Sequence, residues 1–141
     1  AREADFGHAV LASMKLAWQM TPEWFREQAM RRLELSRWCN SVFAEHDLLI
    51  TPTVPFDPPP AKGPFPLETE GRAQLDWGVA SFTIPFNLSL HPAASLRVGL
   101  SQAGLPIGMQ LVAERHRDEL VLQAAHAFER ERPWHPHWPV A

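Results

Sequence analysis

The sequence predicts an α/β protein in which a three-stranded piece of sheet, with an antiparallel hairpin at about residues 93–112, is covered by helices. Two patterns support this fold class. Apolar residues recur at helical spacing through residues 21–46 and again after residue 118, and they alternate with polar or small residues through residues 94–112. The 141 residues suffice for one domain with a core, and 45% of them are apolar, which is ordinary for a globular protein.

The first 46 residues are expected to be helical. A short helix is predicted from roughly Asp5 to Trp18. A second begins at Thr21-Pro22-Glu23, which offers a hydroxyl N-cap, a proline at the first helical position and an acid in the first turn. It is predicted to run to about His46 with one broad apolar face, formed by Trp24, Phe25, Ala29, Leu35, Cys39, Val42 and Phe43.

A strand and a long loop are expected next. Asp47–Ile50 is predicted to be a buried strand that Thr51-Pro52 ends. Residues 54–72 are rich in proline and aperiodic, which favours a long surface loop. Residues 73–82 are expected to form a short helix that ends at Ile84-Pro85, because the helical region is disfavoured for the residue before a proline.

The last part of the chain predicts a hairpin and a terminal helix. Strands are expected over residues 94–100 and 107–112, joined by a turn at Ser101–Pro106. The helix is expected from about Asp118, with an apolar face formed by Val121, Ala124, Ala125 and Phe128. Three strands leave exposed sheet edges unless another segment pairs with them, so self-association of the chain into a homo-oligomer is expected.

Composition excludes several classes of protein. The formal net charge of −3 gives no general attraction to nucleic acid or to anionic lipid. No run approaches the ~20 apolar residues of a bilayer span, and the charged first residues do not resemble a signal peptide. A single cysteine, Cys39, excludes an internal disulfide and fits a reducing compartment. We therefore expect a cytoplasmic protein without nucleic-acid or membrane partners.

The sequence contains only weak candidates for a catalytic nucleophile. A serine–lysine pair needs a lysine that is neutral beside the hydroxyl, but Lys62 lies in the proline-rich loop. Lys15 is two residues from Ser13 on a predicted helix, and residues at that spacing do not face each other. Cys39 with His46 would make a nucleophile and a base, although an apolar helix face favours a packed thiol.

Histidines near the end of the chain raise the question of a metal site. His135 and His137 are compatible with weak zinc capture, with His126 nearby, but no carboxylate or thiol completes a tetrahedral set. We therefore predict no metal and no cofactor. The segment W-H-P-H-W-P at residues 134–139 is interpreted as a tail that packs its two tryptophans onto the domain.

Several motifs occur in a characteristic order. D-L-L-I-T-P-T-V-P lies at residues 47–55, and the stretch Ser81–Val112 contains P-F-N-L-S-L-H-P-A-A-S followed by G-L-P-I-G-M-Q-L-V. D-E-L-V-L-Q-A-A-H-A-F-E follows at residues 118–129, and P-W-H at residues 133–135. Together they resemble the closing segment of the amidase-signature hydrolases.

The resemblance implies the C-terminal part of an amidase-signature fold, an α/β structure with a mixed central sheet between helices. It also implies cleavage of a carboxamide to a carboxylate and ammonia by two serines and a lysine. None of these catalytic residues has a matching position here, so no catalytic residue is expected in this chain. The expected partners are the N-terminal portion of the same amidase, joined covalently or as a separate chain, and a small amide substrate.

The resemblance does predict that this chain forms one wall of the substrate pocket. In the family, the segment similar to residues 83–90 borders the acyl side of the substrate site. Thr83, Phe86 and Leu90 are therefore candidate substrate-binding residues, and Asn87 is expected to brace the turn through its amide. Core or turn roles for all four residues explain their types equally well.

Two positions depart from the family pattern. Leu90 stands where many relatives have glycine, which would narrow or reshape the wall. Arg97 stands where proline is common and places a charge on a face expected to be covered. An anionic substrate, a nearby acidic partner or a loss of activity would each account for this arginine.

One segment of an amidase domain is thus predicted: residues 1–46 helical, 47–72 a strand and a proline-rich loop, and 73–141 a helix, the hairpin, the terminal helix and a tail. The leading hypothesis is the C-terminal portion of an amidase that supplies scaffold and part of the pocket. The alternative is a non-catalytic subunit or truncated homologue that acts as a binding module. A third hypothesis is an independent cysteine- or metal-dependent hydrolase. It would require activity in the isolated chain that is lost on Cys39→Ala or on chelation.

Overall fold

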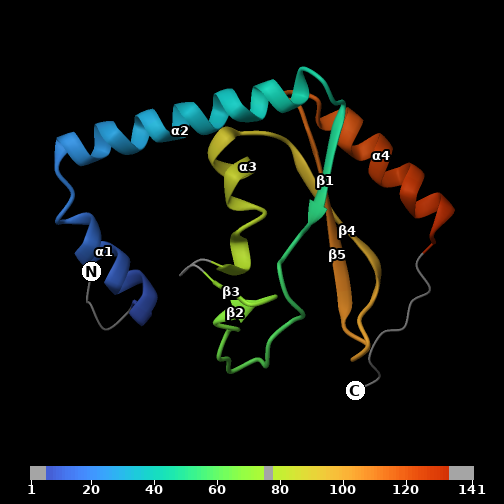
Figure 1. Cartoon of the computed structure of the whole chain (residues 1–141), viewed down its shortest axis with the longest axis horizontal. Helices are drawn as coiled ribbons and strands as arrows, with labels where there is room; N and C mark the ends of the chain where they lie inside the picture. Colours follow the sequence, from blue (N-terminus) through green and yellow to red (C-terminus); the bar gives the residue numbers. More distant parts are fainter. Residues whose placement is uncertain (1–5, 75–77, 134–141) are drawn as a thin grey trace. The chain divides into compact units, whose positions relative to one another are not determined.

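Helices and a small sheet make up the chain, which confirms the predicted α/β class (Figure 1). The computed structural model describes residues 6–74 and 78–133. The chain divides into two compact units, residues 1–34 and residues 35–141, and the second contains the sheet. No helix within the described ranges is long and apolar enough to cross a membrane.

The first unit is helical, as predicted. Helix α1 spans His8–Ala17, and helix α2 spans Pro22–Phe43, so α2 begins in this unit and ends in the second. The predicted start of α2 is confirmed, because the Thr21 hydroxyl accepts a hydrogen bond from the N–H of Trp24 at 3.1 Å. The proline follows at the first helical position, where its missing N–H costs nothing.

The apolar face of α2 is covered only toward the end of the helix. Cys39 is fully buried and Phe43 nearly so, whereas Trp24 and Phe25 are 41% and 69% exposed. The end of α2 packs on the sheet of the second unit, and its early turns belong to the first unit. The helix ends at Phe43 rather than at the predicted His46.

Three strands form the sheet of the second unit, in the order β1-β5-β4. β1 spans Leu48–Pro52, β4 spans Ala93–Leu100 and β5 spans Pro106–Ala113, and both neighbouring pairs are antiparallel. The predicted hairpin is confirmed as β4 and β5, joined by a turn in which Gly104 has a φ of 76°. β1 lies where a strand is predicted, but it continues through Thr51 and Pro52, the residues predicted to end it. The strand is only partly buried: Leu48 and Leu49 are half-buried against the two core clusters, and Ile50 is 62% exposed.

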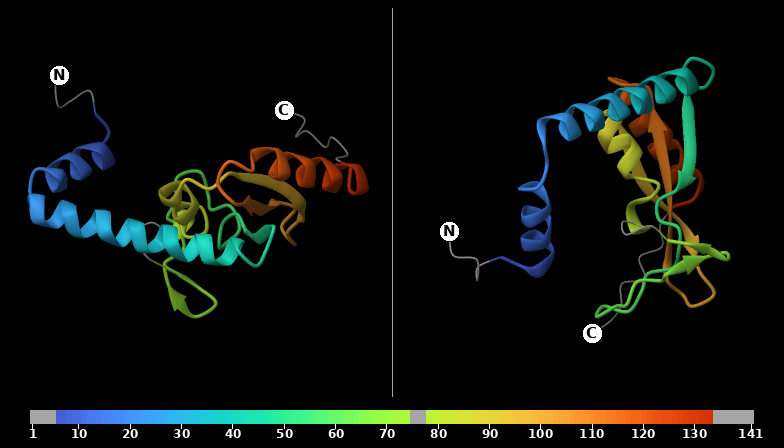
Figure 2. Two further views of the ribbon diagram at one scale, coloured as in Figure 1. Left: turned by 90° about the horizontal axis from the view of Figure 1, so that it is seen from above. Right: turned by 60° about the vertical axis from the view of Figure 1, so that its left-hand side comes forward.

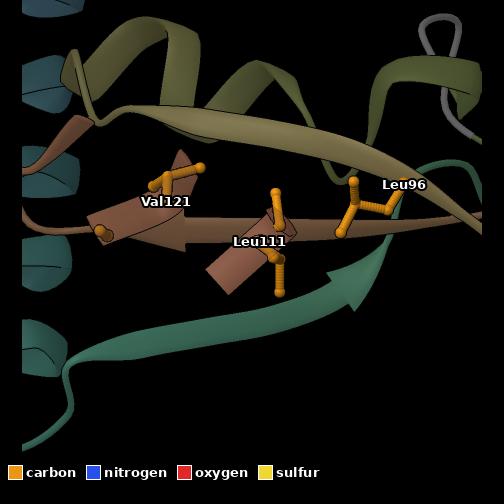
Figure 3. Close-up of a cluster of buried hydrophobic side chains, with 5 residues drawn as sticks. Leu96, Leu111 and Val121 are labelled. Atoms are coloured by element: carbon orange, nitrogen blue, oxygen red, sulfur yellow. The ribbon is translucent and has the colours of Figure 1, made fainter. Parts of the chain in front are cut away.

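Helix α4, Asp118–Glu131, covers one face of the sheet. Its Val121 packs with Leu96 of β4 and Leu111 of β5 (Figure 3). Ala125 of α4 is buried in the same cluster, as the helical spacing predicts. The predicted start and apolar face of the terminal helix are therefore confirmed.

Helix α3, Ile84–Ser89, and the end of α2 cover the opposite face of the sheet. Val112 of β5 packs there with Phe86 of α3 and with Cys39 and Phe43 of α2. The left view of Figure 2 shows the sheet between α4 and the end of α2. Neighbouring residues of the central strand thus meet different helices, and both faces of β5 are buried over residues 110–113.

The proline-rich loop after β1 contains a small element of its own. Strands β2, Glu68–Thr69, and β3, Arg72–Ala73, pair antiparallel as a short hairpin. Glu70 and Gly71 form its turn with φ values of 51° and 73°. The remainder of the segment is irregular, as predicted.

The helix predicted over residues 73–82 is wrong. Residues 75–77 lie outside the described ranges, and Gly78–Ala80 form a single 3₁₀ turn, η2. Ile84-Pro85 begins α3 instead of ending a helix. A proline in the first turn is favourable, because that turn makes no use of its N–H.

Candidate functional site

The predicted pocket segment begins in a series of tight turns before α3. The Ser81 hydroxyl donates to the carbonyl of Gly78 at 2.7 Å, and the Thr83 hydroxyl donates to the carbonyl of Ala80 at 3.3 Å. Thr83 is half-buried and is the N-cap residue of α3. Its hydroxyl is therefore engaged within its own turn, and a contact between Thr83 and substrate stays a prediction.

Phe86 lies in the core of the second unit. Its side chain is 5% exposed and packs against Cys39, Phe43 and Val112. In this position the ring holds α3 against the sheet, and any contact with a substrate would be made by the backbone or by neighbouring residues. Its assignment to the pocket wall stays a prediction.

Leu90 closes α3 in the left-handed helical conformation. Its φ is 62° and its ψ is 37°, its N–H and that of His91 both donate to the carbonyl of Phe86, and the bond from His91 measures 3.1 Å. This left-handed C-cap combines the bond from C″ of a Schellman motif with the bond from C′ of an αL motif, and glycine is favoured at C′ because it has no β-carbon. The side chain of Leu90 is 64% exposed. The left-handed conformation at residue 90 is one that glycine, the residue implied here by the family resemblance, adopts without strain.

Gln110 is a functional candidate that sequence reasoning missed. It is buried in β5, and its amide Nε2 donates to the Thr51 hydroxyl at 2.9 Å and to the Phe82 carbonyl at 2.8 Å. A polar residue in the otherwise apolar run I-G-M-Q-L-V-A was the available signal, because a buried carboxamide requires partners.

Gly108 makes room for a second polar contact beside Gln110. A β-carbon at this position would lie 2.8 Å from the hydroxyl oxygen of Thr53. That hydroxyl is 2.6 Å from the hydroxyl of Ser95 on β4. The G-x-Q pattern of β5 therefore has a physical basis in two polar contacts that reach across the sheet.

Ser89 and His91 form a buried pair that the sequence did not single out. The Ser89 hydroxyl lies 2.8 Å from Nδ1 of His91, and the imidazole stacks on Phe43 with 5.0 Å between ring centroids. Burial lowers the pKa of His91, the nearby Arg115 lowers it further, and contacts with Ser89 and Glu114 oppose this. Because Ser89 is 1% and His91 7% exposed, the pair lacks access for a substrate and acts in packing.

The weak chemical candidates are not brought together by the described part of the chain. The thiol of Cys39 is fully buried, which confirms the packed thiol. Lys15 on α1 and Lys62 in the loop are both exposed. Among residues 6–74 and 78–133, no group of three or more His, Cys, Asp or Glu side chains could hold a metal ion, and His135 and His137 lie outside these ranges.

Arg97 lies half-buried on β4, where the pairing with β5 is irregular. Its backbone partner is Gly108, and the register shifts between Arg97 and Gly99. β4 is an outer strand, and both an outer position and a bulge tolerate proline, the residue that the family resemblance implies here.

Two open hollows lie beside the sheet. One has a volume of about 510 Å³ and is lined by Ile50, Thr51, Pro52, Val98, Ile107, Gly108, Met109, Phe128 and Arg132. The other has a volume of about 370 Å³ and is lined by Pro52, Val54, Pro55, Phe56, Asp57, Thr69, Glu70, Phe82, Pro106, Ile107 and Gly108. Neither hollow is lined by Thr83, Phe86 or Leu90, so the predicted wall and the hollows are different surfaces of the unit.

The family of the chain follows from comparison of its sequence with known proteins. The sequence profile of the Amidase family matches residues 3–122. The chain belongs to the Amidase family. It is 40% identical over 111 residues to a 6-aminohexanoate-cyclic-dimer hydrolase from Paenarthrobacter ureafaciens, an alignment that covers 72% of this chain and 21% of that amidase relative. It is 30% identical over 145 residues to a glutamyl-tRNA(Gln) amidotransferase subunit from Streptococcus equi subsp. zooepidemicus, covering 99% of this chain and 28% of the relative.

Solved structures of amidases share the fold. A bacterial aryl acylamidase of the amidase-signature family superposes with a TM-score of 0.81 at 30% identity, over 93% of this chain and 27% of the acylamidase. A 6-aminohexanoate cyclic dimer hydrolase complexed with substrate gives a TM-score of 0.72 at 34% identity, over 95% of this chain and 30% of the hydrolase. The chain therefore has the fold of one part of an amidase and spans between about a fifth and a third of the length of these relatives.

Proposed function

We propose that this chain is the C-terminal portion of an amidase-signature hydrolase that cleaves a small carboxamide. Water cleaves the C–N bond, so that the carbonyl carbon becomes a carboxylate, the nitrogen leaves as ammonia, and the remaining proton converts the ammonia to ammonium. The two serines and the lysine of the reaction belong to an N-terminal portion, while this chain supplies scaffold and, through Thr83, Phe86 and Leu90, part of the pocket wall.

One observation carries the proposal. At 30% identity the chain superposes over 93% of its length on 27% of an aryl acylamidase. Another relative is a 6-aminohexanoate-cyclic-dimer hydrolase, and a third is an acylamidase from Rhodococcus erythropolis at 38% identity. Two of these names are acylamidases and the third names a hydrolase of a cyclic dimer of an amino acid, which supports hydrolysis of an amide C–N bond by the enzyme to which this chain belongs.

The described residues support placing the chemistry elsewhere. A lysine that activates a serine must be desolvated beside the hydroxyl, and both Lys15 and Lys62 are exposed. The buried Ser89 bonds to His91 beneath Phe43 and has no access for a substrate. The free, buried thiol of Cys39 is in keeping with a reducing, cytoplasmic setting, which is part of the proposal.

The test is an assay of ammonia release from small aliphatic and aromatic carboxamides. We expect no turnover by the purified chain and turnover once the matching N-terminal portion is added. Cys39→Ala and treatment with a chelator serve as controls, because a cysteine- or metal-dependent hydrolase would lose activity in the isolated chain. Turnover by the chain alone would contradict the proposed division of roles.

A non-catalytic subunit or truncated homologue is the second candidate. It is favoured by one observation: a relative that aligns with 99% of this chain is, by its name, one component of an amidotransferase. The upstream reading frame separates the two functions. A glycine- and serine-rich segment preceded by a lysine supports the hydrolase, and a start codon immediately before Ala1 supports the binding module.

A further inference from the structure

Gln110 is a buried polar side chain in the middle of an apolar strand. It is 3% exposed and lies on β5 between Met109 and Leu111. Burial of a carboxamide costs free energy unless it finds hydrogen-bond partners, and a methionine or leucine would bury apolar area without that requirement. A glutamine in this position therefore requires a reason beyond packing.

The amide group of Gln110 joins two segments that are remote in the sequence. Nε2 donates to Thr51 Oγ1 at 2.9 Å and to the carbonyl of Phe82 at 2.8 Å. These partners lie 59 and 28 residues away along the chain. A single amide group thus uses both of its hydrogens to tie β1 to the turn that precedes α3.

That turn sets the position of α3 and of the smaller hollow. Phe82 immediately precedes Thr83, the N-cap residue of α3, and it lines the 370 Å³ hollow together with Pro52 and Ile107. A carbonyl held at residue 82 restricts the backbone of the residue that follows it. The Gln110 amide therefore restrains the start of the segment 83–90, in addition to the packing of Phe86 against Val112.

We propose that Gln110 is a positioning residue for the substrate pocket, and that its carboxamide fixes the Phe82 carbonyl and, with it, the wall segment 83–90 against β1. This inference rests on the proposed function, because it assigns Gln110 to the pocket of that hydrolase. Gln110 acts through the turn and touches no substrate. Since the segment is expected to border the acyl side of the site, the position of the wall selects among acyl groups of different length.

The first test measures selectivity in the enzyme recombined from this chain and its N-terminal portion. Gln110→Met keeps the length of the side chain and removes both donors. We expect the ratio of kcat/KM for a short and a long aliphatic amide to change at least about fivefold, because a displaced wall alters contacts with the acyl group. This ratio does not depend on the fraction of enzyme that is folded, so a purely structural role would leave it unchanged.

Two further variants make the comparison sharper. Thr51→Val removes one acceptor and keeps the bond to Phe82, so a smaller change in the ratio is expected. Gln123→Met makes the same substitution at an exposed position of α4 and is expected to leave the ratio as it is in the unsubstituted enzyme. An unchanged ratio for Gln110→Met in an active enzyme would overturn the inference.

Hydrogen exchange on the chain itself provides a readout that needs no activity. The N–H of Asn87 bonds to the carbonyl of Thr83 at 3.2 Å, and the N–H of His91 to that of Phe86 at 3.1 Å. In Gln110→Met both amides should exchange about tenfold faster while amides between β4 and β5 keep their protection. Unchanged exchange at α3 would also overturn the inference, whereas an inactive recombined enzyme would count against the proposed function alone.

Discussion

Leu90 adopts a strained backbone conformation that lowers the stability of the fold. A non-glycine residue in the left-handed conformation costs about 1–2 kcal/mol, and Leu90 recovers little through burial because its side chain is 64% exposed. Glycine here relieves the strain but adds freedom to the unfolded chain, worth about 0.4–1 kcal/mol. We expect Leu90→Gly to raise the free energy of unfolding by about 0.5 kcal/mol or more, measured by urea denaturation.

The matched control for this prediction is Leu88→Gly. Leu88 lies two positions earlier within α3 and is 40% exposed, so the same substitution should destabilise the chain by about 1 kcal/mol. A loss of stability in Leu90→Gly equal to that in Leu88→Gly would show that the backbone conformation of residue 90 is not the source of the difference.

His91 makes stability depend on pH. Burial and the nearby Arg115 lower the pKa of His91 below its ordinary value of 6.5, so the unfolded chain binds the proton at a higher pH than the folded chain. The stability that the neutral imidazole provides is therefore present above about pH 6.5 and is lost as the pH falls through the folded-state pKa. Urea denaturation at about pH 7.5 and about pH 5.5 should give a smaller unfolding free energy at the lower pH.

His91→Gln serves as the comparison, because glutamine can accept the Ser89 hydrogen bond and does not titrate. The stability of this variant should change less between the two pH values than that of the unsubstituted chain. Equal changes in both proteins would assign the pH dependence to other groups.

At the scale of single elements, the periodic segments could be predicted from the sequence and the proline-flanked ones could not. The start of α2, the β4–β5 hairpin and the face of α4 follow from local patterns, since each buries residues at regular spacing. The sequence does not predict α3, because a proline after Ile84 indicates the end of a helix as well as it indicates the start of one. The contacts of Gln110 could not be predicted, because its partners lie 28 and 59 residues away.

The outer strands β1 and β4 present sheet edges, and Ile50 of β1 is 62% exposed. Such edges pair with other chains unless a charge or another segment protects them. We expect sedimentation velocity to show self-association of the chain that increases with concentration. Ile50→Lys should reduce it, because a charge on an edge strand opposes pairing.

Leu67→Lys is the control for this experiment, since Leu67 is 86% exposed and lies in the loop before β2 rather than in an outer strand of the three-stranded sheet. Adding the N-terminal portion should also suppress self-association if it covers these edges. A monomer at all concentrations would contradict the expectation that the edges are available for pairing.

For the whole molecule, the sheet and the helices that cover it form a scaffold, in agreement with the match to the Amidase family. Lys15 and Lys62 are both exposed, which supports the proposal that the catalytic residues lie outside this chain. The wall residues Thr83, Phe86 and Leu90 remain a prediction from the resemblance, because their contacts in the described chain are with their own turn, the core and solvent.

The most direct test of this division of roles is a titration of the N-terminal portion with the purified chain while ammonia release from a small carboxamide is measured. We predict no turnover by either partner alone and an activity that rises with added chain and saturates at one chain per N-terminal portion. Full turnover by this chain alone, or by the N-terminal portion without it, would contradict the account.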